Sequence, residues 1–261
     1  MENLDQVERL FREHRTGLMA DLDGTLSEMV VRPDEARVSP EVRRALRLLS
    51  AKLPVVAVIT GRSARDGLSM VQVEELTYIG NHGMERIEKG HYSVVDAFKP
   101  FLPELRRATD TLNASLKTPG MWLEDKRVSI SIHYRHCQDQ EQAHRDIVAA
   151  IDSLPNRDKF IVIEGKMVVN FVPAVGSDKG TAVKEVVKEH RLGGGVFIGD
   201  DVTDLDGFRA IRELRQSGGF AGLNVAVLGS DANSQVRELG DYTLAGVGEV
   251  STFLDWLATE L

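Results

Sequence analysis

The segment MADLDGTLSE, residues 19 to 28, places two carboxylates, Asp21 and Asp23, directly after the apolar run GLMA and directly before a glycine. Polar residues also end three later apolar runs. These are Thr60 in VITGRS, Asn81 and His82 in GNHG, and Asp200, Asp201 and Asp204 in IGDDVTD. The carboxyl ends of parallel strands share one edge of a sheet, and ligands bind in crevices at that edge. We therefore expect these residues to converge in space.

Several carboxylates within a few ångströms cannot all stay ionised without positive charge among them, because like charges raise each other's pKa. A hard divalent cation is the simplest compensation, and an oxygen-rich site that keeps several waters suits Mg²⁺. Lys179, at the start of a helix in GSDKG, can add a further positive charge. The sequence thus predicts a Mg²⁺ site beside a lysine ammonium.

The elements that must position these residues alternate between short apolar runs and amphipathic helices, which favours an α/β fold with a mostly parallel, buried sheet. Ser39 precedes Pro40 and an apolar stripe at one-face spacing, which is typical of a helix start. We expect helices at 39–53 and 177–190, and strands at 17–21, 54–60, 77–83, 195–200 and 224–229.

The middle of the chain follows a different order. We expect helices at 103–116 and 140–154 and paired strands at 121–125, 128–135, 159–165 and 167–173. Prolines at 100, 103 and 173 lie near the ends of this segment, where regular structure breaks. The pattern predicts a larger domain, residues 1–97 and 173–261, with a smaller α+β module inserted at 98–172.

Composition limits the possible partners. The chain has 261 residues, of which 42% are hydrophobic, and 32 basic residues against 40 acidic ones give a net charge of -8. That charge opposes general binding to nucleic acids or membrane surfaces, so an anionic substrate needs a local basic cluster. We expect a small-molecule substrate and consider a monomer plausible; the sequence does not determine the oligomeric state.

The location of the protein is predicted from cysteine usage and from the absence of targeting patterns. A single cysteine, Cys137, allows no internal disulfide and favours a reducing compartment. The charged first segment lacks the apolar stretch of a signal peptide, and no apolar run approaches the roughly 20 residues needed to cross a bilayer. These features together predict a cytoplasmic protein.

Four segments, DLDGTL, ITGR, the lysine of SDKG, and GDDVTD, occur in the order and form of the four motifs of the haloacid dehalogenase-like phosphatases, which the chain resembles. The resemblance implies a Rossmann-like core in which Asp21 attacks phosphorus and forms an aspartyl-phosphate. It also implies that Asp23 protonates the leaving group and then activates water, and that Thr60 and Lys179 hold the phosphoryl group. To act as an acid, Asp23 must hold a proton near neutral pH, which its acidic neighbours favour.

The same resemblance implies the metal ligands. Mg²⁺ would be bound by Asp21, the backbone carbonyl of Asp23 and Asp200, while Asp201 and Asp204 would orient the lysine and the waters of the metal. A phosphate monoester brings nearly two negative charges, and one Mg²⁺ with one lysine would offset the carboxylates enough to let it approach.

The inserted module lies between the second and third motifs, as does the larger cap of the second class of this superfamily, whose members often act on phosphorylated sugars. GNHGMER, EDKRVSISIHYR, EGKMVVNFVP and GDDVTD resemble segments of the trehalose-6-phosphate phosphatase family. The resemblance implies a set of candidates for sugar or phosphate contact. They are Gly61, Arg62, His82, Glu85, Lys126, Ser129, His133, Arg135, Lys166 and Asn170.

One departure leaves the substrate open. Where that family usually has Glu before an Arg-Pro step, this chain has Asn170 and then Val172-Pro173. An asparagine can bind a sugar hydroxyl but lacks the charged acceptor, so a phosphatase for another sugar or glycosyl phosphate is an alternative to one for trehalose 6-phosphate. A receiver-type switch, in which a phosphorylated aspartate serves as a signal, is a third hypothesis. Asp23 and the inserted module argue against it, because a switch needs neither an acid/base nor a cap.

Overall fold

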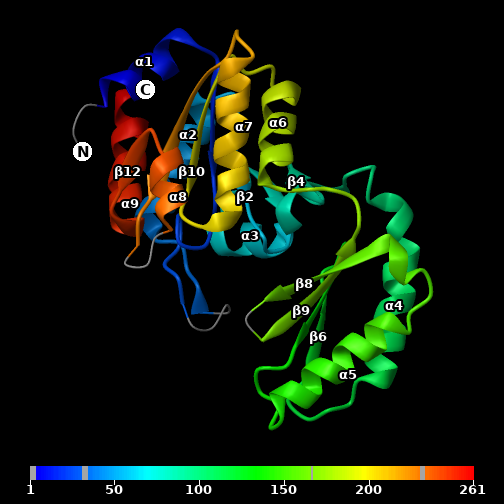
Figure 1. The fold of residues 1–261 in the computed structure, drawn as a ribbon. Coiled ribbons are helices and arrows are strands. Elements are labelled where there is room, and N and C mark those ends of the chain that lie inside the picture. The colour runs from blue at the N-terminus through cyan, green and yellow to red at the C-terminus, as the bar shows by residue number, and fades with distance from the viewer. Residues whose placement is uncertain (1–3, 31–34, 166, 230–232) are drawn as a thin grey trace. The chain divides into compact units, whose positions relative to one another are not determined.

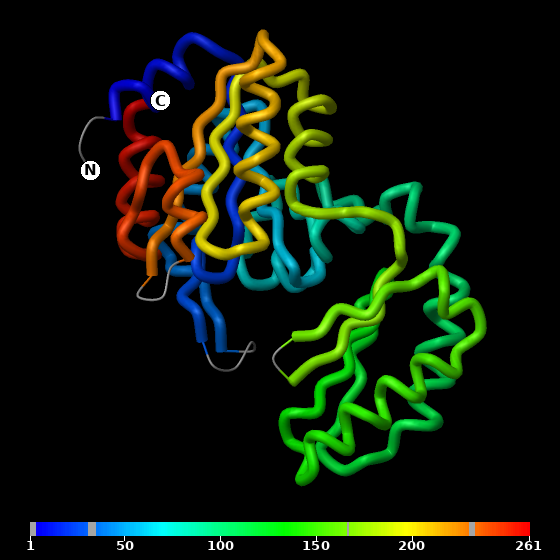
Figure 2. Tube along the Cα trace, in the orientation of Figure 1, coloured from blue at the N-terminus to red at the C-terminus, as the bar shows by residue number. Residues whose placement is uncertain are grey.

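The computed structural model describes residues 4–30, 35–165, 167–229 and 233–261. The chain divides into a larger unit, Met1–Ser93 with Ser177–Leu261, and a smaller unit, Val94–Gly176 (Figure 1). The tube in Figure 2 follows the chain from the blue half of the larger unit through the green smaller unit and back to the yellow and red half. The boundaries predicted from the sequence, at 98 and 172, lie slightly inside the observed ones.

Within the described residues, the sheet of the larger unit has eight strands in the order β12-β11-β10-β1-β2-β3-β4-β5. Neighbours from β12 to β3 pair in parallel, whereas β3 and β4 pair antiparallel. The strands are β1 Thr16–Ala20, β2 Val56–Ile59, β3 Thr77–Gly80, β4 Glu85–Glu88, β5 His91–Val94, β10 Gly194–Gly199, β11 Ala221–Val227 and β12 Tyr242–Leu244. The predicted, mostly parallel sheet is confirmed.

Helices cover both faces of this sheet (Figure 1). On one face α1 (Asp5–Glu13), α2 (Pro40–Lys52), α3 (Ala64–Val71) and α9 (Gly246–Glu260) contribute to one apolar core. On the other face α6 (Lys179–Glu189), α7 (Leu205–Gln216) and α8 (Ser234–Leu239) form a second core. Successive residues of β1 serve both cores, because Leu18 packs in the first and Met19 in the second. The central strands β10, β1, β2 and β3 are consequently buried on both faces, as a parallel sheet between helices requires.

Local sequence explains where the helices that flank the site begin. The Ser39 hydroxyl accepts a hydrogen bond from the backbone N of Val42 at 3.2 Å, so α2 has the predicted N-cap. The Asp178 carboxylate accepts from the backbone N of Thr181 at 2.7 Å and caps α6. Helix α6 therefore begins at Lys179, and its first side chain lies at the carboxyl edge of the sheet.

In the described part of the smaller unit, four strands form an antiparallel sheet in the order β6-β7-β9-β8, covered on one face by two helices. The strands are β6 Trp122–Asp125, β7 Ile130–His133, β8 Phe160–Gly165 and β9 Val168–Pro173, and the helices are α4 Leu102–Ser115 and α5 Gln140–Asp152. The apolar core of this unit lies between the helices and alternate strand residues such as Ile132, Val169 and Phe171. This confirms the predicted α+β module.

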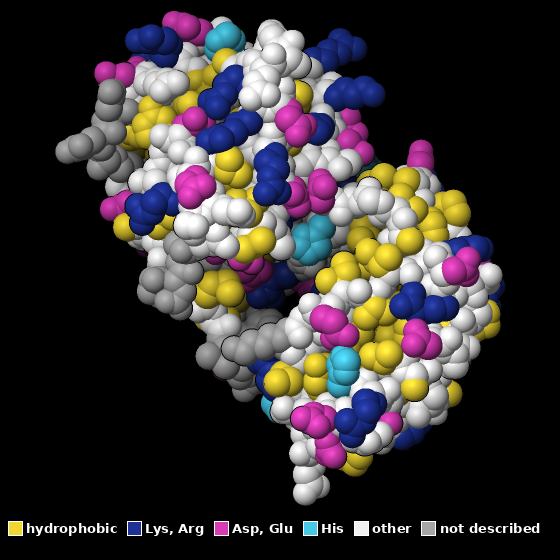
Figure 3. All heavy atoms as spheres, viewed as in Figure 1, with side chains coloured by type: hydrophobic (Ala, Val, Ile, Leu, Met, Phe, Trp, Pro, Cys, Tyr) yellow, Lys and Arg dark blue, Asp and Glu magenta, His cyan; other side chains and the backbone are white. Residues whose placement is uncertain are grey.

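The opposite face of that sheet, which we call the helix-free face, carries polar and apolar side chains together. Figure 3 shows hydrophobic side chains exposed on the smaller unit, and Ile161 and Ile163 of β8 are 47% and 49% exposed.

Among the helices of the described chain, none has both the length and the apolar character needed to cross a membrane.

Candidate active site

The carboxyl edge of the larger sheet surrounds a cavity of about 940 Å³. Asp21 follows β1, Thr60 follows β2, and Asp200 follows β10. These three residues lie at the same edge of the sheet because β1 pairs in parallel with both β2 and β10. The cavity is lined by residues of the larger unit. They include Asp21, Asp23, Thr60, Gly61, Arg62, His82, Lys179, Asp200 and Asp201. The structure thus brings together the side chains that the sequence placed at separate strand ends.

Lys179 is the central cation of the cavity. Its side chain is 3% exposed, and its Nζ donates hydrogen bonds of 2.7 Å to Asp21 Oδ1 and of 2.7 Å to Asp204 Oδ1. Burial by itself would lower the pKa of Lys179, but the two carboxylates outweigh burial and raise this pKa, so the amine is an ammonium. Burial raises the pKa of the Asp21 carboxyl well above its ordinary value, while the ammonium acts in the opposite direction.

Asp204 organises the loop after β10. Its side chain is fully buried, and its Oδ2 accepts hydrogen bonds from the backbone N of Asp200 at 2.9 Å and of Asp201 at 3.0 Å. Asp201 is exposed, and its carboxylate accepts from the backbone N of Val202 at 2.6 Å. Asp204 therefore contacts Lys179, whereas among the described residues the Asp201 carboxylate accepts its hydrogen bond from its own turn.

The cavity also offers oxygen ligands for a cation. Carboxylate oxygens of Asp21, Asp200 and Asp204 lie within 4.8 Å of one another. Asp200 Oδ1 accepts a hydrogen bond of 2.9 Å from the Thr25 hydroxyl, and Asp204 uses both oxygens in hydrogen bonds. Among the described residues, the second oxygens of Asp21 and Asp200 have no hydrogen-bond partner, so both are available to a ligand. This hard, all-oxygen donor set fits Mg²⁺.

The pKa of Asp200 is raised, and a bound cation would lower it. Burial, with a smaller contribution from Asp204, raises the pKa of Asp200 to about 6. Gly24 lets this carboxylate approach the first loop, because a Cβ at Gly24 would lie 2.0 Å from Asp200 Oδ2, and its φ is +87°. The glycine of DLDGTL is therefore required both by the turn and by the neighbouring carboxylate.

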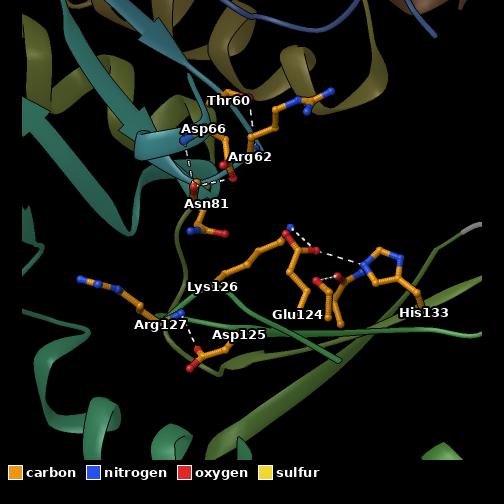
Figure 4. A network of polar contacts seen from close by, with 12 residues as sticks. Thr60, Arg62, Asp66, Asn81, Glu124, Asp125, Lys126, Arg127 and His133 are labelled. Atoms are coloured by element: carbon orange, nitrogen blue, oxygen red, sulfur yellow. Dashed lines mark hydrogen bonds and ion pairs between the residues drawn. The ribbon is translucent and has the colours of Figure 1, made fainter. Parts of the chain in front are cut away.

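Asp23 is held by Arg62. The guanidinium donates from Nε to Asp23 Oδ2 and from Nη2 to Asp23 Oδ1, each at 2.7 Å. The backbone N of Arg62 donates to the Thr60 hydroxyl at 3.1 Å, a contact that Figure 4 shows. His82 packs against Gly61 so closely that a Cβ there would lie 2.7 Å from the His82 ring. The loop 60–62 thus joins the cavity wall to Asp23.

Glu85 is placed differently from the other candidates of this unit. Its side chain is 1% exposed and does not line the cavity described above. Its Oε1 accepts hydrogen bonds from the backbone N of Ala64 at 2.7 Å and from Asn81 Nδ2 at 2.9 Å, and its Oε2 accepts from the Tyr92 hydroxyl at 2.7 Å. The carboxylate is fully engaged inside the larger unit.

In the smaller unit, strand register places two of the remaining candidates, His133 and Asn170, on the helix-free face. Residues directly opposite one another share a face of a sheet, and one such row contains Glu124, Ser131 and Asn170, while the next contains Trp122 and His133. Ser131 Oγ donates to Asn170 Oδ1 at 2.7 Å, and Asn170 Nδ2 donates to the Ile163 carbonyl at 3.2 Å. The Asn170 amide is therefore bound within its own sheet.

His133 is the last residue of β7 on this face. Its ring stacks on Trp122 with centroids 3.9 Å apart and planes 5° apart, and its Nε2 lies 3.0 Å from Glu124 Oε2. Lys126 Nζ lies 4.0 Å from the same carboxylate, and Figure 4 marks this ion pair with a dashed line. Trp122 is 49% exposed and offers an apolar ring surface beside these polar groups.

The other predicted contacts of this unit lie nearby or outside the described chain. Ser129 is 5% exposed beside β7, and its backbone carbonyl accepts from the backbone N of Lys126 at 3.0 Å. Arg135 is exposed just after β7, and its carbonyl accepts from Gln140 Nε2 at 2.9 Å. Lys166 lies outside the residues that the structure describes.

Three residues with roles at these surfaces were not singled out from the sequence. Thr25 belongs to DLDGTL, and Glu124 belongs to EDKRVS beside Lys126, so both stood within segments that carried a signal. Trp122 had none, because an aromatic residue in a predicted strand is equally compatible with the core. Its exposure and its stacking on His133 are tertiary observations.

The sequence is similar to one family of known proteins. The family model described as Trehalose-phosphatase matches residues 19–246. An uncharacterized glycosyl hydrolase of Mycobacterium tuberculosis is 31% identical over 267 residues, which cover 98% of this chain and 19% of that protein. The trehalose-phosphate phosphatase of Mycobacterium avium is 34% identical over 199 residues, covering 74% of this chain and 50% of its own. The chain thus spans from about a fifth to half of the length of these relatives.

Solved structures agree with the fold. The C-terminal domain of trehalose-6-phosphate phosphatase from C. albicans is 22% identical, with a TM-score of 0.72 and coverage of 98% of this chain and 97% of that one. A haloacid dehalogenase-like hydrolase from Bacteroides thetaiotaomicron is 17% identical, with a TM-score of 0.59 and coverage of 93% and 99%. At these identities the likeness concerns the fold alone, and it confirms the predicted haloacid dehalogenase-like core with an inserted unit.

Proposed function

Because the chain belongs to the trehalose-phosphatase family, we propose that it is a phosphatase that hydrolyses trehalose 6-phosphate to trehalose and phosphate. The observation that carries this proposal is the pair of carboxylates in one cavity. Asp21 has one oxygen bound by a buried ammonium and the other free, while Asp23 lies beside it under a guanidinium. Such a pair suits a nucleophile and a separate acid/base.

In the proposed first step, the free oxygen of Asp21 attacks phosphorus as the bond from phosphorus to the sugar oxygen breaks. The sugar oxygen leaves with the electron pair and takes a proton from Asp23, and an aspartyl-phosphate remains. In the second step a water gives a proton to Asp23 and attacks the same phosphorus, which releases phosphate and restores the Asp21 carboxylate. Lys179 keeps Asp21 oriented and offsets charge on the transferring group.

A divalent cation completes the charge balance in this proposal. The Asp21 oxygen that does not attack, the free oxygen of Asp200 and the backbone carbonyl of Asp23 would hold Mg²⁺. When bound, it would supply positive charge that stabilises the transferring phosphoryl group. The hydroxyl of Thr60, at the end of β2, would donate a hydrogen bond to that group.

We assign sugar recognition to the helix-free face of the smaller unit. Lys126 and His133 supply positive or donor groups there, and Glu124 supplies an acceptor. Arg135, exposed just after β7, is a further candidate for sugar or phosphate contact. Asn170 is the reason to keep another sugar or glycosyl phosphate as the second candidate, since its amide lacks the charged acceptor and is already bound to Ser131. Family membership argues against the receiver-type switch.

The test is release of inorganic phosphate from a panel containing trehalose 6-phosphate, other disaccharide phosphates, glucose 6-phosphate and p-nitrophenyl phosphate, with and without Mg²⁺. We expect the highest kcat/KM for trehalose 6-phosphate and no turnover after chelation. A higher kcat/KM for another sugar phosphate would replace the substrate, and no turnover of any ester would refute the phosphatase. A cytoplasmic location, a monomeric state and the lack of nucleic-acid partners stay predictions.

A further inference from the structure

The turn Asn81–Gly83 has an unusual backbone. Its three residues have positive φ values of 49°, 56° and 108°, and two of them, Asn81 and His82, carry side chains. Residues other than glycine adopt this conformation rarely, and when they do, surrounding contacts hold them there. The contacts of this turn therefore explain why it keeps this conformation.

One set of contacts reaches the loop that carries Arg62. The backbone N of Asn81 donates to the Arg62 carbonyl at 2.7 Å, and the backbone N of His82 donates to the Thr60 carbonyl at 3.0 Å. The His82 ring packs on Gly61. The turn therefore fixes the backbone from which the Arg62 guanidinium reaches Asp23.

A second set of contacts reaches both places where the chain passes between its two units. Tyr92 lies in β5, just before the chain leaves the larger unit, and its hydroxyl donates to Glu85 Oε2 at 2.7 Å. Ser177 is the first residue after the chain returns, and its hydroxyl donates to the His82 carbonyl at 2.9 Å. Glu85 in turn accepts from Asn81 Nδ2 and from the backbone N of Ala64.

We propose that Glu85 is a positioning residue. Together with the Asn81–Gly83 turn, it connects Tyr92 and Ser177, where the chain leaves and re-enters the larger unit, through hydrogen bonds to the loop whose Arg62 guanidinium holds Asp23. Glu85 is buried and its two oxygens accept three hydrogen bonds, so a displacement at Tyr92 or Ser177 must be accommodated at this turn. Its role in the reaction is to keep the acid/base aligned, and not to contact the sugar. This inference rests on the proposed function of Asp23.

The test uses the full chain with Tyr92→Phe and Ser177→Ala, each of which removes one hydroxyl. The matched controls are Tyr242→Phe, whose hydroxyl donates to Gln6 at 3.4 Å, and Ser217→Ala, whose hydroxyl donates to the Leu214 carbonyl. The first readout is amide hydrogen exchange of residues 60–66 and 80–86, which needs no substrate. We expect exchange there to be about 2- to 10-fold faster in the two test variants, the range that loss of one hydrogen bond implies, and unchanged in the controls.

The second readout is kcat/KM for two esters. p-Nitrophenolate leaves without protonation, whereas the sugar oxygen needs the proton of Asp23. Tyr92→Phe and Ser177→Ala should therefore lower kcat/KM for trehalose 6-phosphate by about 2- to 10-fold and that for p-nitrophenyl phosphate much less. Glu85→Gln should rescue most of the loss seen in Glu85→Ala, because the amide can still accept from Ala64 and Asn81 and donate to the Tyr92 oxygen.

Unchanged exchange in both test variants would overturn the inference. An equal loss of kcat/KM with both esters, accompanied by a lower Tm, would also overturn it, because it would indicate a purely structural role. A Glu85→Gln variant as defective as Glu85→Ala would overturn it too, because it would indicate a charged contact with substrate. If the wild-type enzyme hydrolyses a different sugar phosphate, the proposed substrate fails, but the exchange readout still decides the inference.

Discussion

Arg62 binds Asp23 through two parallel hydrogen bonds of 2.7 Å, one to each carboxylate oxygen. Both side chains are largely buried, with 22% of Arg62 and 28% of Asp23 exposed. This paired geometry fixes the plane of the carboxylate, and with it the direction in which the group can pass a proton. The residue after the TG step of ITGR thus contacts the second aspartate of DLDGTL directly.

Replacing Arg62 tests this contact. Arg62→Ala should lower kcat/KM for a sugar phosphate by about 10- to 100-fold, within the range that a misaligned general acid loses, and lower that for p-nitrophenyl phosphate less. Arg62→Lys keeps the charge but not the two-pronged geometry and should recover only part of the loss. Steady-state kinetics with both esters checks it; equal activity of the wild type and Arg62→Ala would show that Asp23 needs no such support.

Removing the nucleophile is the sharpest test of the chemistry. Asp21→Asn should reduce kcat by about 1,000-fold or more, since an amide cannot form the phosphoenzyme. The fold should persist, because Lys179 keeps Asp204 as a partner. Phosphate release and circular dichroism measure the two expectations, with Asp110→Asn, an exposed position, as the control for loss of one charge. Appreciable turnover in Asp21→Asn would eliminate it as the nucleophile.

Gly24 and Gly90 form a matched pair. Both have positive φ, +87° and +76°, but a Cβ at Gly24 would lie 2.0 Å from Asp200 Oδ2, whereas nothing lies within 4 Å of a Cβ at Gly90. Alanine at either position should destabilise the fold by about 1–2 kcal/mol through its backbone alone. Only Gly24→Ala should also reduce kcat/KM by about 100-fold or more, because it displaces Asp200. Similar kinetics for the two variants would contradict the role given to Asp200.

The raised pKa of Asp200 predicts a pH dependence of stability in the metal-free protein. This pKa is about 6 in the folded state against an ordinary value of 3.8, so the folded state binds this proton more tightly. The contribution of Asp200 to the free energy of unfolding is therefore fully present below pH 3.8 and is lost as the pH rises through about 6. Subtracting the Tm profile of Asp200→Asn from that of the wild type, both with chelator, should reveal this fall, and a flat difference would refute it.

Mg²⁺ should reverse that loss, because a metal binds the deprotonated carboxylate. At about 100 times its Kd a single-site ligand adds about 2.7 kcal/mol, which corresponds to roughly 5–10 °C in Tm for a unit of this size. We expect the gain in Tm on adding Mg²⁺ to grow from pH 5 to pH 7.5 and to be lost in Asp200→Asn. A gain of the same size in Asp200→Asn would place the ion elsewhere.

Asn170 is the position to test for substrate choice. Asn170→Glu restores the charged acceptor but cannot donate to the Ile163 carbonyl, so the new carboxylate is freer to meet a sugar hydroxyl. We expect the ratio of kcat/KM for trehalose 6-phosphate to that for other sugar phosphates to rise by about 3- to 10-fold. Asn170→Asp, which is charged but shorter, is the control. An unchanged ratio would mean that Asn170 does not set specificity.

Several elements were missed for a physical reason. Strand β5, HYSV, has no buried residue, and β12 has only three residues, so neither shows the apolar run that marked the central strands. Helix α3 is short and contains Gly67, a poor helix former, so its apolar stripe is weak. The ranges predicted for the core strands and for α2, α4, α5 and α6 agree with the structure to within three residues at each end.

The sequence by itself determined the order of elements and the residues that end the central strands, because burial periodicity and helix caps are local properties. A parallel sheet then requires those strand ends to meet, so the convergence of Asp21, Thr60 and Asp200 followed from pattern alone. The motif order was likewise sufficient to identify the family.

Only the tertiary structure decided which charged groups are paired. Arg62 with Asp23, and Lys179 with both Asp21 and Asp204, are contacts between segments separated along the chain. A carboxylate in a motif looks the same whether it faces a cavity or is enclosed by donors. Its partners depend on which loops the fold places beside it, and that depends on long-range packing.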